Sequence, residues 1–239
     1  IADWLDVALV APATANIIGK MANGISDDAV SSTLMAVNNL RVIVPAMNTK
    51  MFDNPATQAN ISRLESFGYV VMEPDEGFLA EGYSGKGRMP SVEDIVEMVE
   101  YQYMRHNSPQ WLEGQKVVVT AGGTVERIDP VRYISNDSSG QMGYAMARAA
   151  SFYGADVTLI STKRDLKVPH NITAVYVESA VEMQKELNKY FLDTNYVVMA
   201  AAVSDYRVLN RADQKIKKEA GSDNSLQLDL AENPDILAT

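Results

Sequence analysis

The feature that most constrains the fold is a regular alternation of short apolar runs with longer helical patterns. Continuous apolar runs such as Val117-Val118-Val119 are typical of strands buried on both faces of a parallel sheet. Strands are expected at residues 7–10, 41–44, 69–72, 116–120, 155–160 and 196–200, and helices at 14–22, 27–38, 54–67, 91–104, 140–153 and 180–191. The alternation predicts an α/β protein with two Rossmann-like, doubly wound parallel-sheet domains in series. Each domain is expected to be incomplete, because about three strands are visible where such sheets usually have five or six.

A polar segment separates the two series. Residues 105–115 contain Pro109 and Gly114, so they are expected to form a linker between domains at residues 1–104 and 116–239. The chain begins at Ile1 in the middle of the pattern, with no Met and no basic leader. We therefore expect a segment of a longer chain that lacks both ends.

The bulk composition excludes several classes of protein. No apolar run approaches the roughly 18 residues that a membrane span needs. The chain has no cysteine, which excludes disulfides and thiolate metal sites. A net charge of −10 argues against a nucleic-acid partner, although backbone N–H groups can still hold the phosphates of a nucleotide. An acidic chain without cysteine is expected in the cytoplasm.

A glycine-rich turn follows the strand expected at residues 116–120. Gly122-Gly123 would let backbone N–H groups approach an anion, and Ser138-Ser139-Gly140 stands where the next helix is expected to begin. The alternative is that these residues form only a turn and an N-cap. A nicotinamide reductase is disfavoured, because G-x-G-x-x-G is absent and no Tyr is followed by Lys four residues later.

Four ordered blocks in this second half carry a specific resemblance. They are AGGTVERIDPVRYISNDSSGQMG (121–143), AAAVSDYR (200–207), KIKK (215–218) and ENPDIL (232–237). In residues, order and spacing they resemble the phosphopantothenate–cysteine ligases. The resemblance implies CTP as the nucleotide and Mg²⁺ as its counterion. It also implies two steps: the carboxylate of 4′-phosphopantothenate attacks the α-phosphate of CTP, and the amine of cysteine then displaces CMP from the acyl-cytidylate.

The same resemblance implies roles for individual residues. Lys215 would contact the triphosphate, Asp205 would belong to the nucleotide site, and Asn136 would act on the acyl-cytidylate. The other expected CTP-binding residues are Gly122, Gly123, Ser138, Ser139, Gly140, Met199, Ala200, Ala201, Pro234, Asp235, Ile236 and Leu237. Each key residue has a structural alternative: Lys215 in a solvated loop, Asp205 as a cap of the next element, Asn136 as a turn residue, and Asn233-Pro234-Asp235 as a helix start.

The first half resembles the flavin-dependent cysteine decarboxylases. The matching blocks are ADWLDVALVAPATANIIGKMANGISDD (2–28) and PAMNTKM (45–51). In that family Thr14 and Asn16 would lie near FMN, and Asn48 would contact the substrate carboxylate. The two resemblances together indicate the bacterial fused flavoproteins of coenzyme A biosynthesis, which are homo-oligomers with decarboxylase trimers and ligase dimers.

One departure from the decarboxylase pattern bears on activity. The family loop L-A-C-G-x-x-G-x-G-R is present as LAEGYSGKGR (79–88), so Glu81 stands where the family has its proton-donating Cys. Glu81 is a candidate substitute donor, because burial can raise the pKa of a carboxyl group into a useful range. Neither His106 nor His170 matches the family's catalytic His. The alternative function is therefore a non-catalytic, flavin-binding scaffold or regulatory module.

Overall fold

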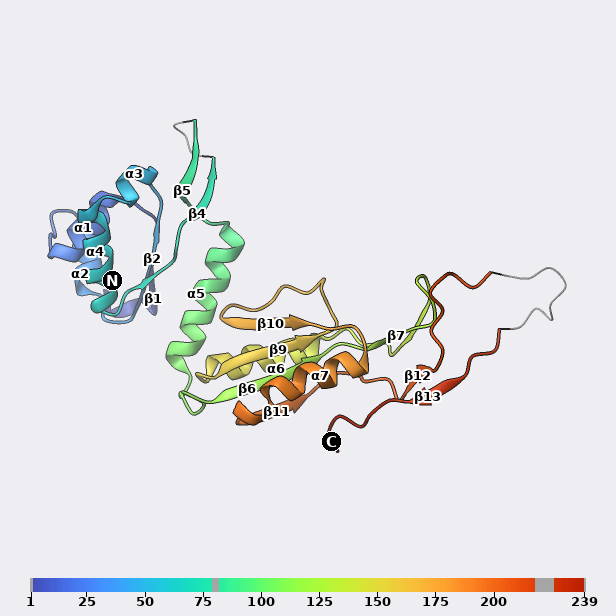
Figure 1. The fold of residues 1–239 in the computed structure, drawn as a ribbon. Helices are drawn as coiled ribbons and strands as arrows, with labels where there is room; N and C mark the ends of the chain where they lie inside the picture. Colours follow the sequence, from blue (N-terminus) through green and yellow to red (C-terminus); the bar gives the residue numbers. More distant parts are fainter. Residues whose placement is uncertain (1, 79–81, 218–225, 239) are drawn as a thin grey trace. The chain divides into compact units, whose positions relative to one another are not determined.

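A computed structural model describes residues 2–78, 82–217 and 226–238 (Figure 1). The chain divides into two compact units, Ile1–Asn107 and Ser108–Thr239. Both contain a parallel sheet with helices, so the predicted α/β class is confirmed. Among the helices of the described ranges, none combines the length and the apolar character that crossing a bilayer requires.

Unit 1 is built on a three-stranded parallel sheet in the order β1-β2-β3. Its elements are η1 (Ala2–Trp4), β1 (Val7–Ala13), α1 (Ala15–Asn23), α2 (Ala29–Ala36), β2 (Leu40–Pro45), α3 (Thr49–Phe52), α4 (Pro55–Ser66), β3 (Val70–Val71), β4 (Asp75–Phe78), β5 (Ser84–Arg88) and α5 (Val92–Asn107). Local sequence explains where two of the helices start. Thr14 caps α1, and Asn54 caps α4 with Pro55 as its first residue. Strands β4 and β5 form a separate antiparallel hairpin.

Unit 2 is built on a four-stranded parallel sheet in the order β10-β9-β6-β11. Its elements are β6 (Lys116–Ala121), β7 (Val125–Arg127), β8 (Tyr133–Ser135), α6 (Gln141–Phe152), β9 (Asp156–Ser161), β10 (Ile172–Tyr176), α7 (Ala180–Tyr190), η2 (Phe191–Asp193), β11 (Tyr196–Met199), β12 (Tyr206–Val208) and β13 (Leu230–Glu232). The chain moves outward from β6 to β9 and β10, then returns to place β11 on the other side of β6. Because the strand order reverses between the neighbouring strands β6 and β11, their carboxyl ends form a topological switch point.

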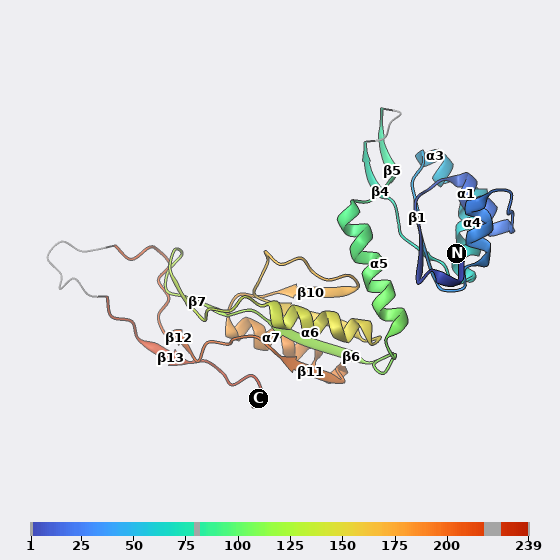
Figure 2. The same cartoon turned by 180° about the vertical axis from the view of Figure 1, so that it is seen from behind.

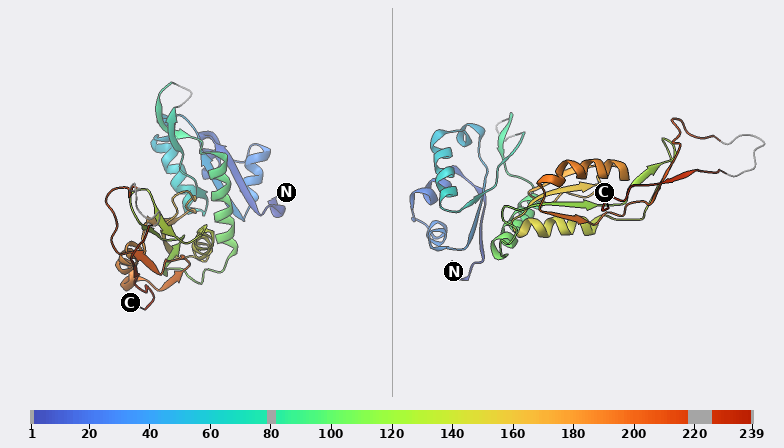
Figure 3. Two further views of the ribbon diagram at one scale, coloured as in Figure 1. Left: turned by 90° about the vertical axis from the view of Figure 1, so that its right-hand side faces the viewer. Right: turned by 60° about the horizontal axis from the view of Figure 1, so that its bottom comes forward.

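The two faces of this sheet are covered by different helices. Val117, Val119 and Ala121 of β6 belong to a core cluster with Tyr144 and Ala147 of α6. Val118 points to the opposite face and belongs to a cluster with Met183 and Leu187 of α7. Helix α7 lies in front of the sheet in Figure 1 and α6 in front in Figure 2, and Figure 3 shows the sheet between them. The doubly wound arrangement follows directly from this alternation.

Several elements differ from the expectations. Unit 2 has a fourth parallel strand, β10, which was not expected because it is a half-buried edge strand without a clean apolar run. Helix α5 continues to Asn107, so residues 105–107 of the expected linker are helical. The antiparallel pairs β7–β8 and β12–β13 were not expected either, since their short strands carry little local signal.

Candidate functional site

The loops that leave β6 and β11 run side by side at the switch point. The N–H of Ala202 donates to the Gly122 carbonyl at 2.8 Å, and the N–H of Thr124 donates to the Ala202 carbonyl at 3.2 Å. The hydroxyl of Thr124 in turn accepts the Ser204 N–H at 2.9 Å. The parallel pairing therefore continues past the ends of the regular strands, through a bridge between Gly123 and Ala202. This arrangement fixes the carboxyl edge of the sheet, where open α/β folds bind ligands.

Close packing explains the glycines of this region. A Cβ on Gly122, whose φ is 89°, would lie 2.2 Å from the Thr162 hydroxyl. A Cβ on Gly123 would lie 2.5 Å from the Asn136 carbonyl oxygen. Both distances are far below van der Waals contact, so a side chain at either position would displace the loop.

A third glycine, which was not expected from the sequence, sits on α6. A Cβ on Gly143 would lie 2.5 Å from the Cβ of Ala121 and 2.7 Å from the carbonyl oxygen of Thr120. Gly143 therefore allows α6 to pack directly on the end of β6, the role that a third glycine has in dinucleotide-binding folds. Its spacing of three residues after Gly140 was the signal that could have identified it.

The expected phosphate-binding residues lie at the start of α6. Gly140 is the N-cap with a φ of 77°, and α6 starts at Gln141. The Ser138 hydroxyl accepts the Gly140 N–H, and the Ser139 hydroxyl accepts the Gln141 N–H, each at 3.4 Å. These hydrogen bonds are longer than the usual 2.7–3.2 Å, so an anion would compete well for the same N–H groups.

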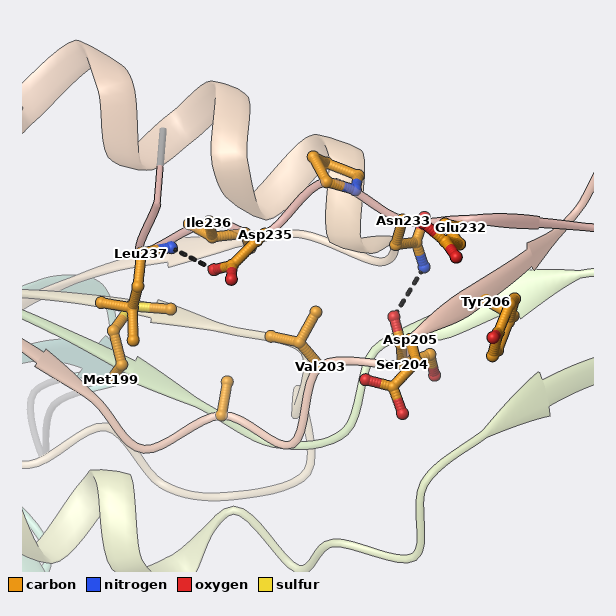
Figure 4. A pocket seen from close by; sticks show the side chains of 12 residues that line it. Met199, Val203, Ser204, Asp205, Tyr206, Glu232, Asn233, Asp235, Ile236 and Leu237 are labelled. Carbon is orange, nitrogen blue, oxygen red and sulfur yellow. Dashed lines mark hydrogen bonds between the residues drawn. The ribbon is translucent and has the colours of Figure 1, made fainter.

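A pocket of about 660 Å³ opens beside these loops (Figure 4). Two segments line it. The first begins at the last residue of β11, and the second includes the last residue of β13; we call the second, residues 232–237, the C-terminal wall. The lining residues are Met199, Ala201, Val203, Ser204, Asp205, Tyr206, Glu232, Asn233, Pro234, Asp235, Ile236 and Leu237. The volume falls within the range of roughly 300–1,000 Å³ that is typical of small-molecule sites.

Asn233 joins the C-terminal wall to the loop after β11. Its N–H donates to the Asp205 carbonyl at 2.7 Å, and its side-chain Nδ2 donates to the Ser204 carbonyl at 2.8 Å (Figure 4). The Arg207 guanidinium donates to the Asn233 Oδ1 at 3.3 Å. Within the wall, Asp235 Oδ1 accepts the Leu237 N–H at 3.0 Å and closes a turn. Asn233 was expected only as part of a helix start, and its partners lie 26 to 29 residues away, where they carry no local signal.

The structure brings together only some of the predicted CTP-binding residues. Those that line one pocket are Met199, Ala201, Asp205, Pro234, Asp235, Ile236 and Leu237. Gly122, Gly123, Ser138, Ser139, Gly140 and Ala200 lie at the same end of the sheet but are not among the pocket-lining residues. The predicted site is therefore spread along this edge, with the pocket at one side of it.

Asn136 lies beside Gly123, which is in the turn after β6, and contacts the loop after β11. Its Nδ2 donates to the carbonyls of Ala202 and Val203, at 3.3 and 3.2 Å. The side-chain amide therefore supports the loop after β11. In this arrangement its N–H groups are engaged by backbone oxygens, so donation to a reacting group would require these hydrogen bonds to be exchanged.

Lys215 lies away from the pocket lining, in an exposed segment without regular secondary structure. Its neighbour Ile216 donates its N–H to Asp129 Oδ2 at 3.2 Å, and Ala212 donates to the Ile128 carbonyl at 2.9 Å. The segment is thus held against the turn at residues 128–132.

Within this turn, hydrogen bonds from Arg132 are the main reason that the pKa of Asp129 lies well below its usual value.

In unit 1 the predicted residues lie at the carboxyl edge of β1 and β2. Thr14 accepts the Ile17 N–H at 3.4 Å as the N-cap of α1, and Asn16 is exposed in the first turn of that helix. Asn48 caps α3, and its Nδ2 donates to the Tyr83 hydroxyl at 2.8 Å. Glu81, the candidate proton donor, lies outside the described residues.

Two glycines of β5 fit against the turn that carries Asn48. A Cβ on Gly85 would lie 2.4 Å from the Thr49 hydroxyl, and a Cβ on Gly87 would lie 2.1 Å from the Met47 carbonyl oxygen. The N–H of Met47 donates to the Gly87 carbonyl at 3.0 Å. The G-x-G spacing of this hairpin is therefore required for its approach to the residue expected to bind substrate.

No cluster of three or more potential metal ligands exists among the His, Asp and Glu side chains of the described residues. The described residues therefore identify no set of metal ligands. Asp205, which was expected in the nucleotide site, does line the pocket.

The comparisons with known proteins agree with the two-unit architecture. The model of the DNA/pantothenate metabolism flavoprotein C-terminal domain matches residues 112–239, and the Flavoprotein model matches residues 1–104. The coenzyme A biosynthesis bifunctional protein CoaBC of Bacillus subtilis (strain 168) is 45% identical over 237 residues, which cover 99% of this chain and 57% of that protein. CoaBC of Mycobacterium tuberculosis (strain ATCC 25618 / H37Rv) is 42% identical over 235 residues, covering 98% and 56%.

A solved structure matches one part of the chain. The crystal structure of the C-terminal domain of a coenzyme A biosynthesis bifunctional protein CoaBC is 37% identical and covers 54% of this chain and 59% of that chain, with a TM-score of 0.46. This chain spans a little more than half the length of the curated relatives, 57% of the Bacillus protein. The resemblance inferred from the sequence blocks is confirmed. The chain belongs to the family of the DNA/pantothenate metabolism flavoprotein C-terminal domain, preceded here by a flavoprotein domain, and is a homologue of the CoaBC ligase and decarboxylase enzymes of coenzyme A biosynthesis.

Proposed function

We propose that unit 2 carries the nucleotide site of a CTP-dependent ligase that joins 4′-phosphopantothenate to cysteine, and that unit 1 belongs to an FMN-dependent decarboxylase acting on the product. The observation that carries the ligase proposal is the pocket at the switch point, lined by seven of the expected residues. Their identities were derived from blocks spread over residues 199–237, and the fold gathers them around one cavity. The carboxyl edge of an open α/β sheet is also where nucleotides bind.

In this proposal the base of CTP lies in the pocket and the phosphates extend toward α6. Met199 and Ala201 on one side, and Ile236 on the other, form apolar surfaces suited to a flat pyrimidine. The N–H groups at the start of α6, beside Ser138 and Ser139, would hold phosphate oxygens with the favourable end of the helix dipole. Lys215 and a Mg²⁺ ion bound to the triphosphate would neutralise the remaining charge.

The chemistry requires positioning and charge neutralisation more than a covalent catalyst. The carboxylate of 4′-phosphopantothenate attacks the α-phosphate of CTP, and pyrophosphate leaves. The amine of cysteine then attacks the acyl carbon, and CMP leaves with the amide formed. Asn136 would serve the second step, because its amide lies against the loop that borders the pocket and can donate to a developing oxyanion when its hydrogen bonds to the Ala202 and Val203 carbonyls are exchanged.

In unit 1, Thr14 and Asn16 would hold FMN at the start of α1, and Asn48 would bind the substrate carboxylate. Their common position at the carboxyl edge of β1 and β2 supports this assignment, since Ala46 donates to the Ala13 carbonyl at 3.1 Å and keeps the two strand ends together. FMN supplies the oxidising capacity for decarboxylation when it is bound. The decarboxylase trimers and ligase dimers implied by the resemblance belong to the same proposal.

The test of the ligase uses the full-length protein with CTP, Mg²⁺, 4′-phosphopantothenate and cysteine, and measures pyrophosphate. We expect CTP-dependent release, which Lys215→Gln abolishes. Lys185→Gln, an exposed lysine on α7, is the matched control and should behave as wild type. Normal ligation by Lys215→Gln would refute the nucleotide-site assignment. A yellow protein without CTP-dependent pyrophosphate release would instead support the flavin-binding scaffold.

Two further variants separate the later steps. Asn136→Asp removes the amide that is proposed to donate to the oxyanion of the second step, so the acyl-cytidylate should form and accumulate, detectable by rapid quench and mass spectrometry. For the decarboxylase, Glu81→Gln should lower carbon dioxide release. If the release equals that of wild type, Glu81 is not the substitute proton donor.

A further inference from the structure

The turn at residues 128–132 holds a fully buried carboxylate. The Asp129 side chain has 0% exposure. Its Oδ1 accepts the N–H groups of Val131 and Arg132, both at 2.8 Å. Its Oδ2 accepts the Arg132 Nε at 3.0 Å and Nη2 at 2.6 Å, so the guanidinium binds it through two nitrogens. A buried charge is tolerated only with such compensation, which makes the Asp129–Arg132 pair a rigid unit.

This pair also binds a segment far away in the sequence. The N–H of Ile216 donates to Asp129 Oδ2 at 3.2 Å, and Arg132 Nη2 donates to the Ile216 carbonyl at 3.1 Å. Both backbone polar groups of Ile216 are therefore held by one ion pair. Together with the hydrogen bond from Ala212 to the Ile128 carbonyl, these contacts hold both ends of the stretch 212–216.

Lys215 lies inside this held stretch. Residues 211–217 have no helix or strand of their own, so the backbone around Lys215 depends on the turn for its position. A lysine side chain loses up to about 2 kcal/mol of rotamer freedom when it is fixed, and a mobile backbone would add further loss. A fixed backbone at Ile216 limits the region that the ammonium group can reach.

We propose that Asp129 is a positioning residue for Lys215: with Arg132 it holds the Ile216 backbone so that the ammonium group of Lys215 reaches the triphosphate of the nucleotide. The inference rests on the proposed function, in which Lys215 contacts CTP, and it assigns Asp129 a role in nucleotide activation. Asp129 itself touches no substrate. Its carboxylate acts through the backbone of the residue after the lysine.

The experiment compares Asp129→Asn with Asp213→Asn in the full-length protein. The Asp129→Asn substitution keeps the size of the side chain but removes the ion pair and presents an amide to a guanidinium. We expect a KM for CTP raised about tenfold and a slower pyrophosphate burst, with the KM for cysteine unchanged. Asp213 lies exposed on the same segment and is the matched control, expected to behave as wild type. Hydrogen exchange at the Ile216 amide should accelerate only in Asp129→Asn.

A double-mutant cycle decides between positioning and general stability. The cycle is measured on the Kd for CTP, because Lys215→Gln is expected to release no pyrophosphate. If Asp129 acts through Lys215, Asp129→Asn should weaken CTP binding in the wild-type background but add no further loss of affinity in the Lys215→Gln background. Additive losses, or equal increases in both KM values, would overturn the inference. If Asp129→Asn behaves as wild type while Lys215→Gln is impaired, the inference about Asp129 is wrong but the proposed function stands. If Lys215→Gln also behaves as wild type, the proposed function is wrong as well.

If Asp129→Asn does not fold, Arg132→Lys provides the same cycle. It keeps a cation beside Asp129 but removes the second nitrogen that reaches the Ile216 carbonyl. The expected pattern is the same, with a smaller rise in the KM for CTP. An unchanged KM for CTP together with faster exchange at Ile216 would show that the position of this segment does not matter for the nucleotide.

Discussion

Replacing Gly143 by Ala tests whether direct contact between α6 and β6 sets the geometry at the carboxyl edge of the sheet, where the nucleotide is proposed to bind. The added Cβ would lie 2.5 Å from the Ala121 Cβ, 2.7 Å from the Thr120 carbonyl oxygen and 3.0 Å from the Ala121 Cα. Carbon atoms pack at about 3.5–4.0 Å, so α6 must move away from the strand by roughly 1 Å. Two of these three neighbours are backbone atoms, which cannot rotate aside.

The expected magnitude follows from two opposing effects. Forcing a methyl group into a packed interior typically costs about 1–3 kcal/mol, and backbone neighbours place this case in the upper part of that range. Alanine in place of glycine inside a helix returns about 1 kcal/mol. The net loss in the free energy of unfolding should be about 1–2 kcal/mol, which lowers the Tm of a unit of this size by roughly 4–7 °C.

Calorimetry, which can resolve transitions of separate units, is the suitable assay, together with the KM for CTP. The KM should rise because the start of α6 moves with the helix. Gly19→Ala is the matched control: it also adds a methyl group inside a helix, but its nearest neighbour would be Asn60 Nδ2 at 3.6 Å, an ordinary contact. The control should be neutral or slightly stabilising. A Gly143→Ala variant as stable as the control would refute the idea that this glycine fixes the helix.

Two other predictions follow from the contacts of the site. Asn233→Ala should raise the KM for CTP several-fold and lower the free energy of unfolding by about 1 kcal/mol, because the C-terminal wall loses its hydrogen bond to the Ser204 carbonyl; Asp235→Asn, which keeps the oxygen that accepts the Leu237 N–H, should have a smaller effect on unfolding. Arg132 holds the pKa of Asp129 below the value of about 3.9 expected in the unfolded chain, so the folded state binds fewer protons. The stabilisation that this carboxylate gives the folded state is therefore complete above about pH 4 and declines below it. Thermal unfolding between pH 7 and 3 should show a weaker acid dependence in Asp129→Asn.

The sheet and its helices were predictable because their signals are local. Buried central strands such as β6 and β9 are continuous apolar runs, and caps such as Thr14 mark a helix start within a few residues. The edge strand β10 lacks that signal, because one of its residues is exposed and the others are only half-buried. The short pairs β7–β8 and β12–β13 form through tertiary pairing, which local preference does not encode.

The candidate site was predictable as a set of residues but not as an arrangement. The blocks around Asp205 and Pro234 were identified from their order, and the fold places them around one pocket. The partners of Asn136 lie 66 and 67 residues away, and the Arg132–Ile216 contact spans 84 residues. Such distances carry no periodic signal, so only the structure could show that Asn136 supports a loop and that Lys215 lies beside the turn at 128–132.

The pairing of β12 with β13 has a consequence for how this site can be altered. Tyr206 pairs with Glu232 and Val208 with Leu230, so the ribbon brings the two pocket-lining segments together at its base, whatever length of chain joins its other end. An insertion between the two strands that leaves residues 212–216 and their contacts intact would cost mainly loop-closure entropy, roughly 0.6 kcal/mol for each doubling of the length, and would keep the strand pairing in register. A single-residue deletion within the ribbon would turn the paired side chains to the opposite face. The length of chain between the two strands can therefore change without altering the surface that is proposed to hold the base of the nucleotide.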